Sequence, residues 1–477
     1  MKFKIFNDKG FWKNAIKLAT PIALQNMLIS SFTLADTLFV SRLGDVSLSA
    51  VGMIGQWGWL LNMIIIGISS GTSVFVSQYW GIKDKRRINM TCGIAVISVL
   101  LVSGVFTAVS FFFPELVVNI FNGEDNVITE GKEYLLIVLF SYPAVAISNI
   151  LSSVLRSVER VRLPMYVSVL TTVLNIFLDY GMIFGKFGFN EMGIKGAALA
   201  TSISAWVGVA AILLISVIEK NILIAPLKTT FGFKLEDVSA FYKKAFPVIF
   251  NESMWGVGTF AFNIIFGHMG HEYFAALTIL RSFENIAFVF FIGICTACCI
   301  MVGKSVGKGM IERGIQDSKR FMIIAPILAI FISILIYIFR PQLIGIFNMG
   351  NNISDVTLKT AMTIMAFYAF EFTVRQIPYI SIVGVFRSGG DTVTGVKYDL
   401  CCLWGLSLPA TLIAVYVLKL PFTVAFAVMY IFEDYVKTAL CIRYYRSLKW
   451  IKPVTDEGKN GLEEFLKKKD VECDGAR

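Results

Sequence analysis

The chain has 477 residues, of which 56% are hydrophobic and only 16% are charged, and its mean hydropathy is +0.71. A composition this apolar excludes an ordinary soluble domain and indicates an integral membrane protein. The formal net charge is +10, which in a soluble protein would suggest nucleic-acid binding. Here the lysines and arginines gather in short segments such as "KDKRR" and "RSVERVR" between apolar runs. We therefore expect no nucleic-acid partner.

Apolar runs of about 20 residues, the length that crosses hydrocarbon as a helix, recur along the whole chain. They predict an all-α membrane protein with twelve transmembrane helices. The approximate ranges are 15–41, 48–79, 92–113, 134–155, 163–185, 193–218, 244–267, 273–302, 321–345, 360–386, 394–417 and 421–442. The five loops that join an even-numbered helix to the next helix hold far more lysines and arginines than the six alternate loops do. Because cytoplasmic loops are enriched in these residues, we expect a multi-pass protein of the plasma (inner) membrane with both termini in the cytoplasm.

The sequence contains an internal repeat. Pro21 in "LATPIALQNM" corresponds to Pro247 in "KAFPVIFNES" at an offset of 226 residues, and Arg156 corresponds to Arg387 at an offset of 231. Since each copy holds six helices, an even number, both copies should have the same orientation and be related by a pseudo-two-fold axis along the membrane normal. The predicted domains are a first six-helix bundle (1–220), a cytoplasmic linker (221–243), a second six-helix bundle (244–450) and a cytoplasmic tail (451–477).

Polar residues of the first bundle share one predicted depth. Asp36 lies six residues from Arg42, at the outer edge of the first helix, and so roughly 9 Å inside that edge. Asp179 and Thr201 stand at a similar depth, about 10 and 9 Å from the outer ends of their helices. Asn175 is one turn from Asp179 on the same face. Because an intramembrane acid is costly and oxygen ligands suit hard cations, we expect a site here for a proton or a cation, the alternative being separate hydrogen bonds to neighbouring helices.

The second copy does not repeat these acids, since Phe262 stands where the first copy has Asp36. Its helices hold other acids, and most of them have a basic residue three or four positions away, which favours local ion pairs. These pairs are Arg281 with Glu284, Glu371 with Arg375, and Glu433 with Lys437. Glu252 has no basic partner within a turn and is the better candidate to face a cavity, where an acid beside aromatic and methionine side chains would attract an organic cation. The candidate cavity residues are Glu252, Glu371, Met27, Trp57, Met254 and Trp255.

Several stretches, taken together, resemble the multidrug and toxic compound extrusion (MATE) family. They are "ADTLFVSRLG", "VSQYWGIKDKRR", "LNIFLDYGMIFG" followed by "GIKGAALATSIS", and "VGVFRSGGDT" with "YRSLKWI", and the similarity spans about residues 10–452. The resemblance implies a two-lobed exporter with a central cavity. It also implies a proton or cation site in the first lobe, with Na⁺ as a possible ligand of Asp36 and Asp179. The residues of that implied site are Asp36, Asn175, Asp179, Ala197 and Thr201.

The expected function is secondary active antiport by alternating access, in which cationic amphipathic molecules leave in exchange for protons or sodium ions. We expect no catalysis and no bound cofactor, and a monomer surrounded by membrane lipids. A lipid-linked sugar flippase of the same broad superfamily is an alternative, but it would need more helices or a strongly basic cavity. A membrane-embedded acyltransferase would need a reactive histidine or cysteine arrangement, and His268, His271 and the eight cysteines form none in the sequence.

Overall fold

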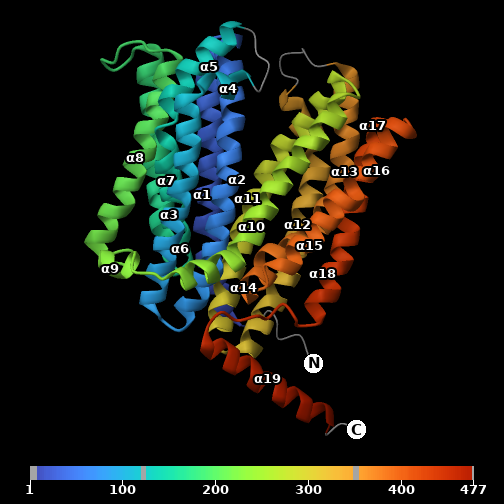
Figure 1. Ribbon diagram of the computed structural model, residues 1–477. Helices are drawn as coiled ribbons and strands as arrows, with labels where there is room; N and C mark the ends of the chain where they lie inside the picture. The colour runs from blue at the N-terminus through green and yellow to red at the C-terminus, as the bar shows by residue number, and fades with distance from the viewer. Residues whose placement is uncertain (1–7, 120–124, 348–353, 475–477) are drawn as a thin grey trace. The chain divides into compact units, whose positions relative to one another are not determined.

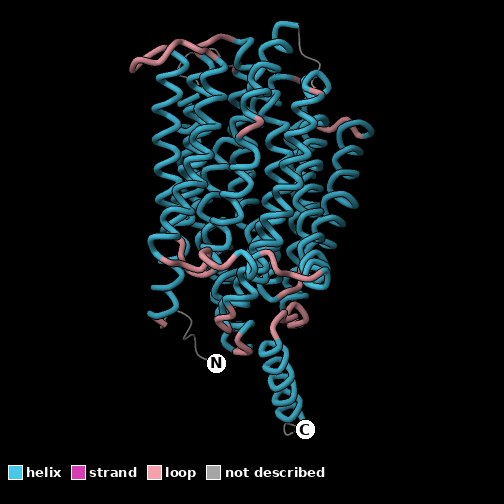
Figure 2. The backbone as a smooth tube through the Cα atoms, turned by 60° about the vertical axis from the view of Figure 1, so that its left-hand side comes forward, coloured by secondary structure: helices cyan, strands magenta, loops and turns pink. Residues whose placement is uncertain are grey.

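The computed structural model describes residues 8–119, 125–347 and 354–474. Within these ranges the protein is helical, with short connecting segments and a single isolated β-bridge between Gly390 and Ile451 (Figures 1 and 2). The all-α fold predicted from the apolar runs is therefore confirmed.

The first half of the chain forms helices that follow the predicted ranges closely. They are α1 (Lys9–Ser41), α2 (Asp45–Gly81), α3 (Lys85–Phe112), α4 (Pro114–Asn119), α5 (Asp125–Val138), α6 (Ser141–Ser157), α7 (Arg162–Phe184), α8 (Ile194–Glu219) and the short α9 (Leu227–Thr230). A bend of 49° separates α5 from α6, which together form one candidate span.

The second half is less regular, because four π-helical turns interrupt its last spans. The elements are α10 (Leu235–Gly267), α11 (His271–Gly307), α12 (Ile311–Phe347), α13 (Asp355–Tyr379), η1 (Ile380–Phe386), α14 (Arg387–Gly389), α15 (Val393–Leu400), η2 (Cys401–Ser407), α16 (Leu408–Leu412), η3 (Ile413–Val417), α17 (Phe422–Tyr430), η4 (Ile431–Tyr435), α18 (Val436–Arg446) and α19 (Asp456–Asp474). π-Helical turns are rare and frequently mark functional positions.

Eight helices among the described residues are long and apolar enough to cross a membrane, or nine when α5 and α6 count as one span. The helix α10, the α13–η1 segment and the α17–η4–α18 segment bring the described spans to the twelve predicted. These three hold charged residues within their length, including Glu371, Glu433 and Lys437, and such residues lower the apolarity by which spans are recognised.

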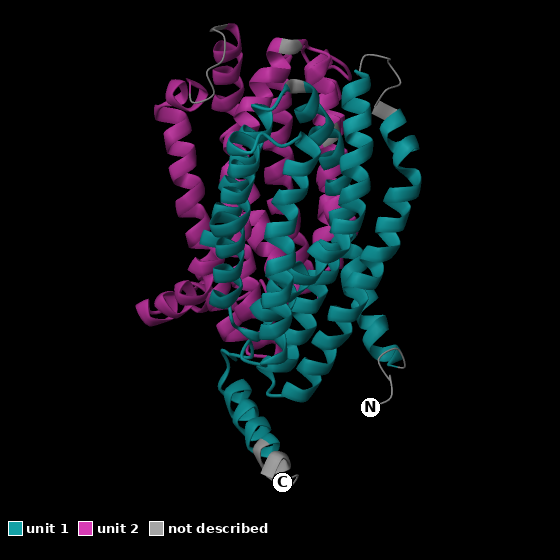
Figure 3. Ribbon diagram, turned by 90° about the vertical axis from the view of Figure 1, so that its right-hand side faces the viewer, with its two compact units in different colours: residues 1–23, 250–477 teal, residues 24–249 magenta. Residues whose placement is uncertain are grey.

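The chain forms two compact units, residues 24–249 and residues 1–23 together with 250–477 (Figure 3). The unit boundaries fall inside α1 and α10, two residues after Pro21 and Pro247. Proline lacks the amide proton of a regular helical turn and so weakens the helix at both points. The predicted domains 1–220 and 244–450 describe the duplication rather than the packing, and they stay a prediction.

Candidate functional site

The polar residues of α7 are buried where α8 packs closely against this helix. Asn175 and Asp179 are four residues apart, on one face of α7, and both are fully buried. Gly196 of α8 allows the close approach, because a Cβ atom at this position would stand 2.8 Å from the backbone carbonyl group of Met182. Ala197, the next residue, is also fully buried. The contact between the two helices therefore brings Ala197 of α8 beside the α7 turn that follows Asp179, and Thr201 lies one turn further along α8.

Asp36 of α1 reaches the same region of the unit formed by residues 24–249. One turn after Asp36, the ring of Phe39 contacts the rings of Tyr180 and Phe184, each at 6.2 Å between centroids. The Asp36 and Asp179 carboxyl groups are close enough to interact electrostatically with each other, and both interact with Tyr134 of α5. The structure thus brings the two predicted acids together and adds a buried tyrosine that the sequence analysis did not find.

Most polar atoms of this group lack a hydrogen-bond partner in the described part of the structure. They are Oδ1 of Asp36, both amide atoms of Asn175, both carboxylate oxygens of Asp179 and Oγ1 of Thr201. Buried polar atoms are nearly always satisfied by protein, water or an ion, and leaving one unsatisfied costs about 1–3 kcal/mol. Two carboxylates with amide and hydroxyl oxygens suit a proton or a hard monovalent cation such as Na⁺. This group, defined by Asp36, Asn175, Asp179 and Thr201, is hereafter the N-site.

The apolar candidates for a substrate cavity lie in different units. Met27 and Trp255 are exposed, whereas Met254 is half-buried. The indole of Trp57 donates a hydrogen bond to Ser110 Oγ at 3.0 Å and packs against the ring of Phe106. Met27 and Trp57 belong to residues 24–249, and Met254 and Trp255 belong to the other unit. Neither unit by itself brings these four side chains together.

Glu252 has a basic partner that its local sequence does not indicate. The Arg387 guanidinium group, 135 residues further along the chain, donates a hydrogen bond to Glu252 Oε1 at 2.8 Å. Glu252 has no basic partner within a turn, as its local sequence indicates, but α14 supplies one from a distant part of the same unit. Its place at a cavity stays a prediction. Glu371 differs, since it is buried and neither of its carboxylate oxygens has a hydrogen-bond partner among the described residues.

Two predicted local ion pairs are replaced by a contact between helices. Glu284 of α11 binds Arg375 of α13 at 2.6 Å, and Arg375 also donates to the Tyr430 hydroxyl at 3.3 Å. Arg281 instead donates a hydrogen bond to the side-chain oxygen of Asn263. The pair between the helices gives each of these largely buried charges the partner that it requires.

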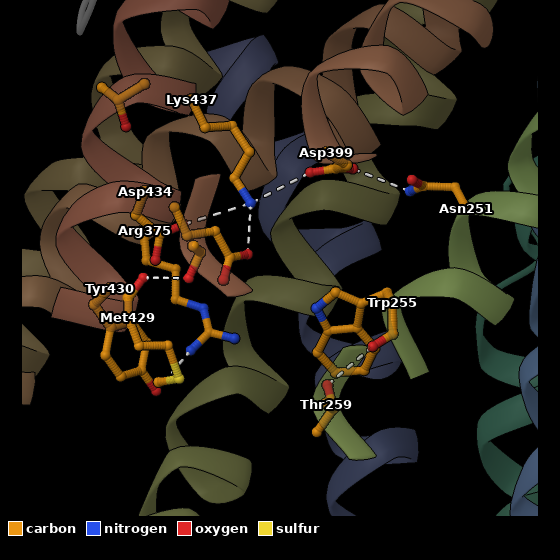
Figure 4. A network of polar contacts seen from close by, with 12 residues as sticks. Asn251, Trp255, Thr259, Arg375, Asp399, Met429, Tyr430, Asp434 and Lys437 are labelled. Atoms are coloured by element: carbon orange, nitrogen blue, oxygen red, sulfur yellow. Dashed lines mark hydrogen bonds and ion pairs between the residues drawn. The ribbon is translucent and has the colours of Figure 1, made fainter. Parts of the chain in front are cut away.

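The third predicted pair, Glu433 with Lys437, is confirmed at 3.0 Å. It belongs to a larger network, in which Lys437 Nζ also lies 3.3 Å from Asp399 and 3.5 Å from Asp434 (Figure 4). Asn251 of α10 in turn donates a hydrogen bond to Asp399 at 3.0 Å. The sequence analysis did not single out Asn251, Asp399 or Asp434, which come from three separate segments.

Two of the motifs that carry the family resemblance meet at the end of the C-terminal bundle. Asp391 of "RSGGDT" accepts hydrogen bonds from the hydroxyl groups of Thr394 and Tyr444 and from Lys452 Nζ. Burial raises the pKa of Asp391, but the hydrogen bonds from Lys452, Tyr444 and Thr394 outweigh this effect and hold the pKa below its usual range. Trp450 of "YRSLKWI" is fully buried beside Gly389, where a Cβ atom would stand 2.4 Å from the indole ring.

Comparisons with known proteins agree with this architecture. The family model described as MatE matches residues 21–181 and 247–413, one segment in each copy of the repeat. A probable multidrug resistance protein NorM of Thermotoga maritima is 29% identical over 441 residues, which cover 92% of this chain and 93% of that protein. A multidrug resistance protein NorM of Vibrio cholerae is 23% identical over 409 residues, covering 83% of this chain and 86% of the relative.

Solved structures share the fold at low sequence identity. A MOP superfamily transporter from Pyrococcus furiosus superposes with a TM-score of 0.83 at 19% identity, covering 91% of this chain and 95% of that one. A MATE transporter of Vibrio cholerae superposes with a TM-score of 0.82 at 18% identity, covering 93% and 98%. The twelve-helix fold and the two segments matched by the family model lead to one conclusion: the chain belongs to the MatE family of membrane transporters.

Proposed function

We propose that this protein is a secondary active multidrug exporter, which expels cationic amphipathic small molecules in exchange for protons or sodium ions by alternating access. The N-site carries the proposal. Its two acids lie inside a membrane protein, and the polar atoms around them lack partners in the described structure. The relatives named multidrug resistance proteins, which align over most of their length, support export of small molecules.

The proposed mechanism depends on the negative charge of the two N-site carboxylates. A proton or sodium ion that enters the N-site neutralises part of the charge of Asp36 and Asp179 and satisfies the buried oxygens. Export is coupled only if ion and substrate disfavour each other's binding, and such linkage is reciprocal. The bound ion then favours the state that has released its substrate, and departure of the ion on the other side restores the state that binds substrate.

The substitution Asp36→Asn tests this mechanism. It removes one carboxylate while keeping the size of the side chain, so we expect gradient-driven efflux of a fluorescent cation from proteoliposomes to fall by roughly tenfold or more. Gradients of pH and of sodium imposed separately identify the coupling ion. Asp456→Asn makes the same chemical change at an exposed residue of α19 and should leave the flux unaltered. Undiminished efflux by a folded, inserted Asp36→Asn protein would refute the proposal.

The remaining assignments belong to the same proposal. The excess of lysine and arginine in alternate loops supports cytoplasmic termini in the plasma (inner) membrane. Organic cations are the proposed substrates, membrane lipids the surroundings and a monomer the working form, with no nucleic-acid partner. We propose transport without catalysis and without a bound cofactor, the coupling ion being a substrate.

A further inference from the structure

The Lys437 network stands apart from the other ion pairs of the C-terminal bundle. Arg387 pairs with Glu252, and Arg375 pairs with Glu284, one base to one acid. Lys437, in contrast, lies within 3.5 Å of carboxylate oxygens from three acids. These are Glu433 at 3.0 Å, Asp399 at 3.3 Å and Asp434 at 3.5 Å. A buried charge is stabilised only when it is paired. Arg375 also attracts Asp434 electrostatically, but it already pairs with Glu284, so the cluster has more acids than bases.

The side chains around Lys437 have more acceptor oxygens than the N–H donors of its ammonium group can satisfy. The Asp434 side chain is only 2% exposed, and neither of its oxygens has a hydrogen-bond partner among the described residues. The same holds for Oδ1 of Asn251, a buried residue whose amide nitrogen binds Asp399. Each ammonium group has three N–H donors. The cluster therefore has unused acceptors for a cation that brings donors of its own.

Local backbone geometry brings the acids together. Glu433 and Asp434 are consecutive residues of the π-helical η4 segment, and both reach the ammonium group of Lys437. Lys437 lies in the first turn of α18, which follows η4 directly. Consecutive residues of a regular α-helix point in directions about 100° apart, and a π-helical turn, wider than an α-helical turn, changes this spacing. Asp399 comes from α15 and completes the group across the bundle.

The cluster is occupied by an ammonium group, since Lys437 Nζ lies 3.0, 3.3 and 3.5 Å from oxygens of Glu433, Asp399 and Asp434. The described residues contain no group of three or more acid, histidine or cysteine ligands placed to hold a metal ion. The structure thus shows a carboxylate cage around an ammonium group, and that group belongs to the protein.

We propose that Asp399, Glu433 and Asp434 form a binding site for organic cations that carry N–H groups, such as protonated amines, and that Lys437 is its exchangeable internal occupant. The Asp399 side chain is 21% exposed and gives the incoming cation its first contact. Figure 4 shows Trp255, an exposed residue one turn after Asn251, on the side of the network where Asp399 lies. Its ring offers cation–π attraction to an aromatic amine.

Lys437 acts in this proposal as a tethered competitor. A tethered group competes at a high effective concentration, of order millimolar for a flexible link, so it weakens the binding of a free amine. Removal of the lysine charge should therefore strengthen amine binding. The inference rests on the proposed handling of organic cations, but equilibrium binding requires no ion gradient, so failure of transport and failure of this site give different results.

The test compares benzylamine with benzyltrimethylammonium, an aromatic cation of the same charge without N–H groups. Binding to the detergent-solubilised full chain is measured by calorimetry at pH 7. For Lys437→Gln we expect the benzylamine Kd to fall by about tenfold or more, equivalent to about 1.4 kcal/mol, while the Kd of benzyltrimethylammonium changes less than about threefold. Lys452→Gln removes another lysine paired with an aspartate of the same unit, and it should leave both constants unchanged.

An unchanged or higher benzylamine Kd in folded Lys437→Gln overturns the proposal. An equal gain for both probes also overturns it, since charge alone would then explain binding. If the single variant fails to fold, Lys437→Gln combined with Asp434→Asn removes one charge of each sign. We expect this double variant to bind benzylamine several-fold more tightly than the unmodified protein, because the competitor is gone and two acids remain. Absence of that gain would refute the site.

Discussion

Asp391 should contribute measurably to the stability of the C-terminal bundle, and Asp391→Asn tests the size of that contribution. Its carboxylate accepts hydrogen bonds from the backbone amides of Val393 and Thr394, from the Thr394 and Tyr444 hydroxyl groups, and from Lys452 at 2.8 Å. Asparagine keeps one oxygen, which can still serve the two amides. Its NH₂ group, however, meets the Lys452 ammonium, which can only donate.

The magnitude follows from the lost contacts. A hydrogen bond to a charged group contributes about 1.5–3 kcal/mol, but Lys452 is 47% exposed and can turn to water, which reduces its share to about 1 kcal/mol. The hydroxyl groups of Thr394 and Tyr444 can rotate to donate elsewhere, and their poorer geometry adds about 1 kcal/mol. We therefore expect Asp391→Asn to lower the free energy of unfolding by about 2 kcal/mol at pH 7.

Thermal unfolding in detergent, combined with limited proteolysis of the tail after Arg446, measures this effect. Asp456→Asn, an exposed residue of α19 paired with Lys459, is the matched control and should cost less than about 0.5 kcal/mol. The reasoning is wrong if Asp391→Asn is as stable as this control, or if proteolysis of the tail is unchanged.

Because hydrogen bonding holds the folded pKa of Asp391 below its usual value, the contribution of this carboxylate to the free energy of unfolding depends on pH. It is fully present above about pH 4 and is lost as pH falls through the lower folded pKa.

Two further predictions follow from the packing. Gly196→Val should push α8 away from the carbonyl group of Met182, which a Cβ atom would approach to 2.8 Å. We expect a lower melting temperature and gradient-driven efflux reduced by about tenfold or more. Normal efflux would show that the α7–α8 contact does not position the N-site. Arg387→Met should leave the Glu252 carboxylate without its ion pair and cost about 3 kcal/mol in unfolding experiments, whereas Arg387→Met combined with Glu252→Gln should recover most of that loss. Failure of the second substitution to restore stability would contradict the pairing.

The membrane fold was predictable because its signals are local. A run of about 20 apolar residues specifies a spanning helix without reference to the rest of the chain, and an even number of helices in each copy fixes the orientation of the repeat. The π-helical turns of the last spans were not predictable, because they depend on packing between helices. The positions where α1 and α10 pass from one unit to the other are indicated only by Pro21 and Pro247.

The proximity of Asp36 and Asp179 was predictable because the distance along each helix gives the depth of the residue. Counting residues from Arg42 places Asp36 near the level of Asp179, and the structure brings the two acids into electrostatic contact. Tyr134 was not predictable, because a tyrosine within an apolar run carries no sequence pattern that separates it from other buried aromatic residues. The role of these residues in ion coupling stays a prediction.

The ion pairs show where reasoning from local sequence fails. Spacing along one helix correctly predicted Glu433 with Lys437. It failed for Glu284, whose partner Arg375 comes from another helix, and it could not supply the partner of Glu252, which is 135 residues away. A single sequence contains no signal for such contacts unless the repeat supplies one. In this chain the repeat does not supply it: the repeat-related Arg156 donates to Gln25 of α1, but an offset of 226 residues pairs Gln25 with Asn251 and not with Glu252.

The two bundles differ in the number of basic side chains that lie beside their buried acids. In the N-site, Asp36 and Asp179 lie together with no basic side chain in the group, so under the proposed function the coupling proton or ion supplies the compensating charge. In the C-terminal bundle the protein supplies Arg375, Arg387 and Lys437, and two of these pair one to one with an acid. Among the described residues of this bundle, the Lys437 cluster and Glu371 keep buried carboxylate oxygens without a hydrogen-bond partner. An exporter that loads ions in one half and organic cations in the other would need this asymmetry, because identical sites would compete for the same ligand.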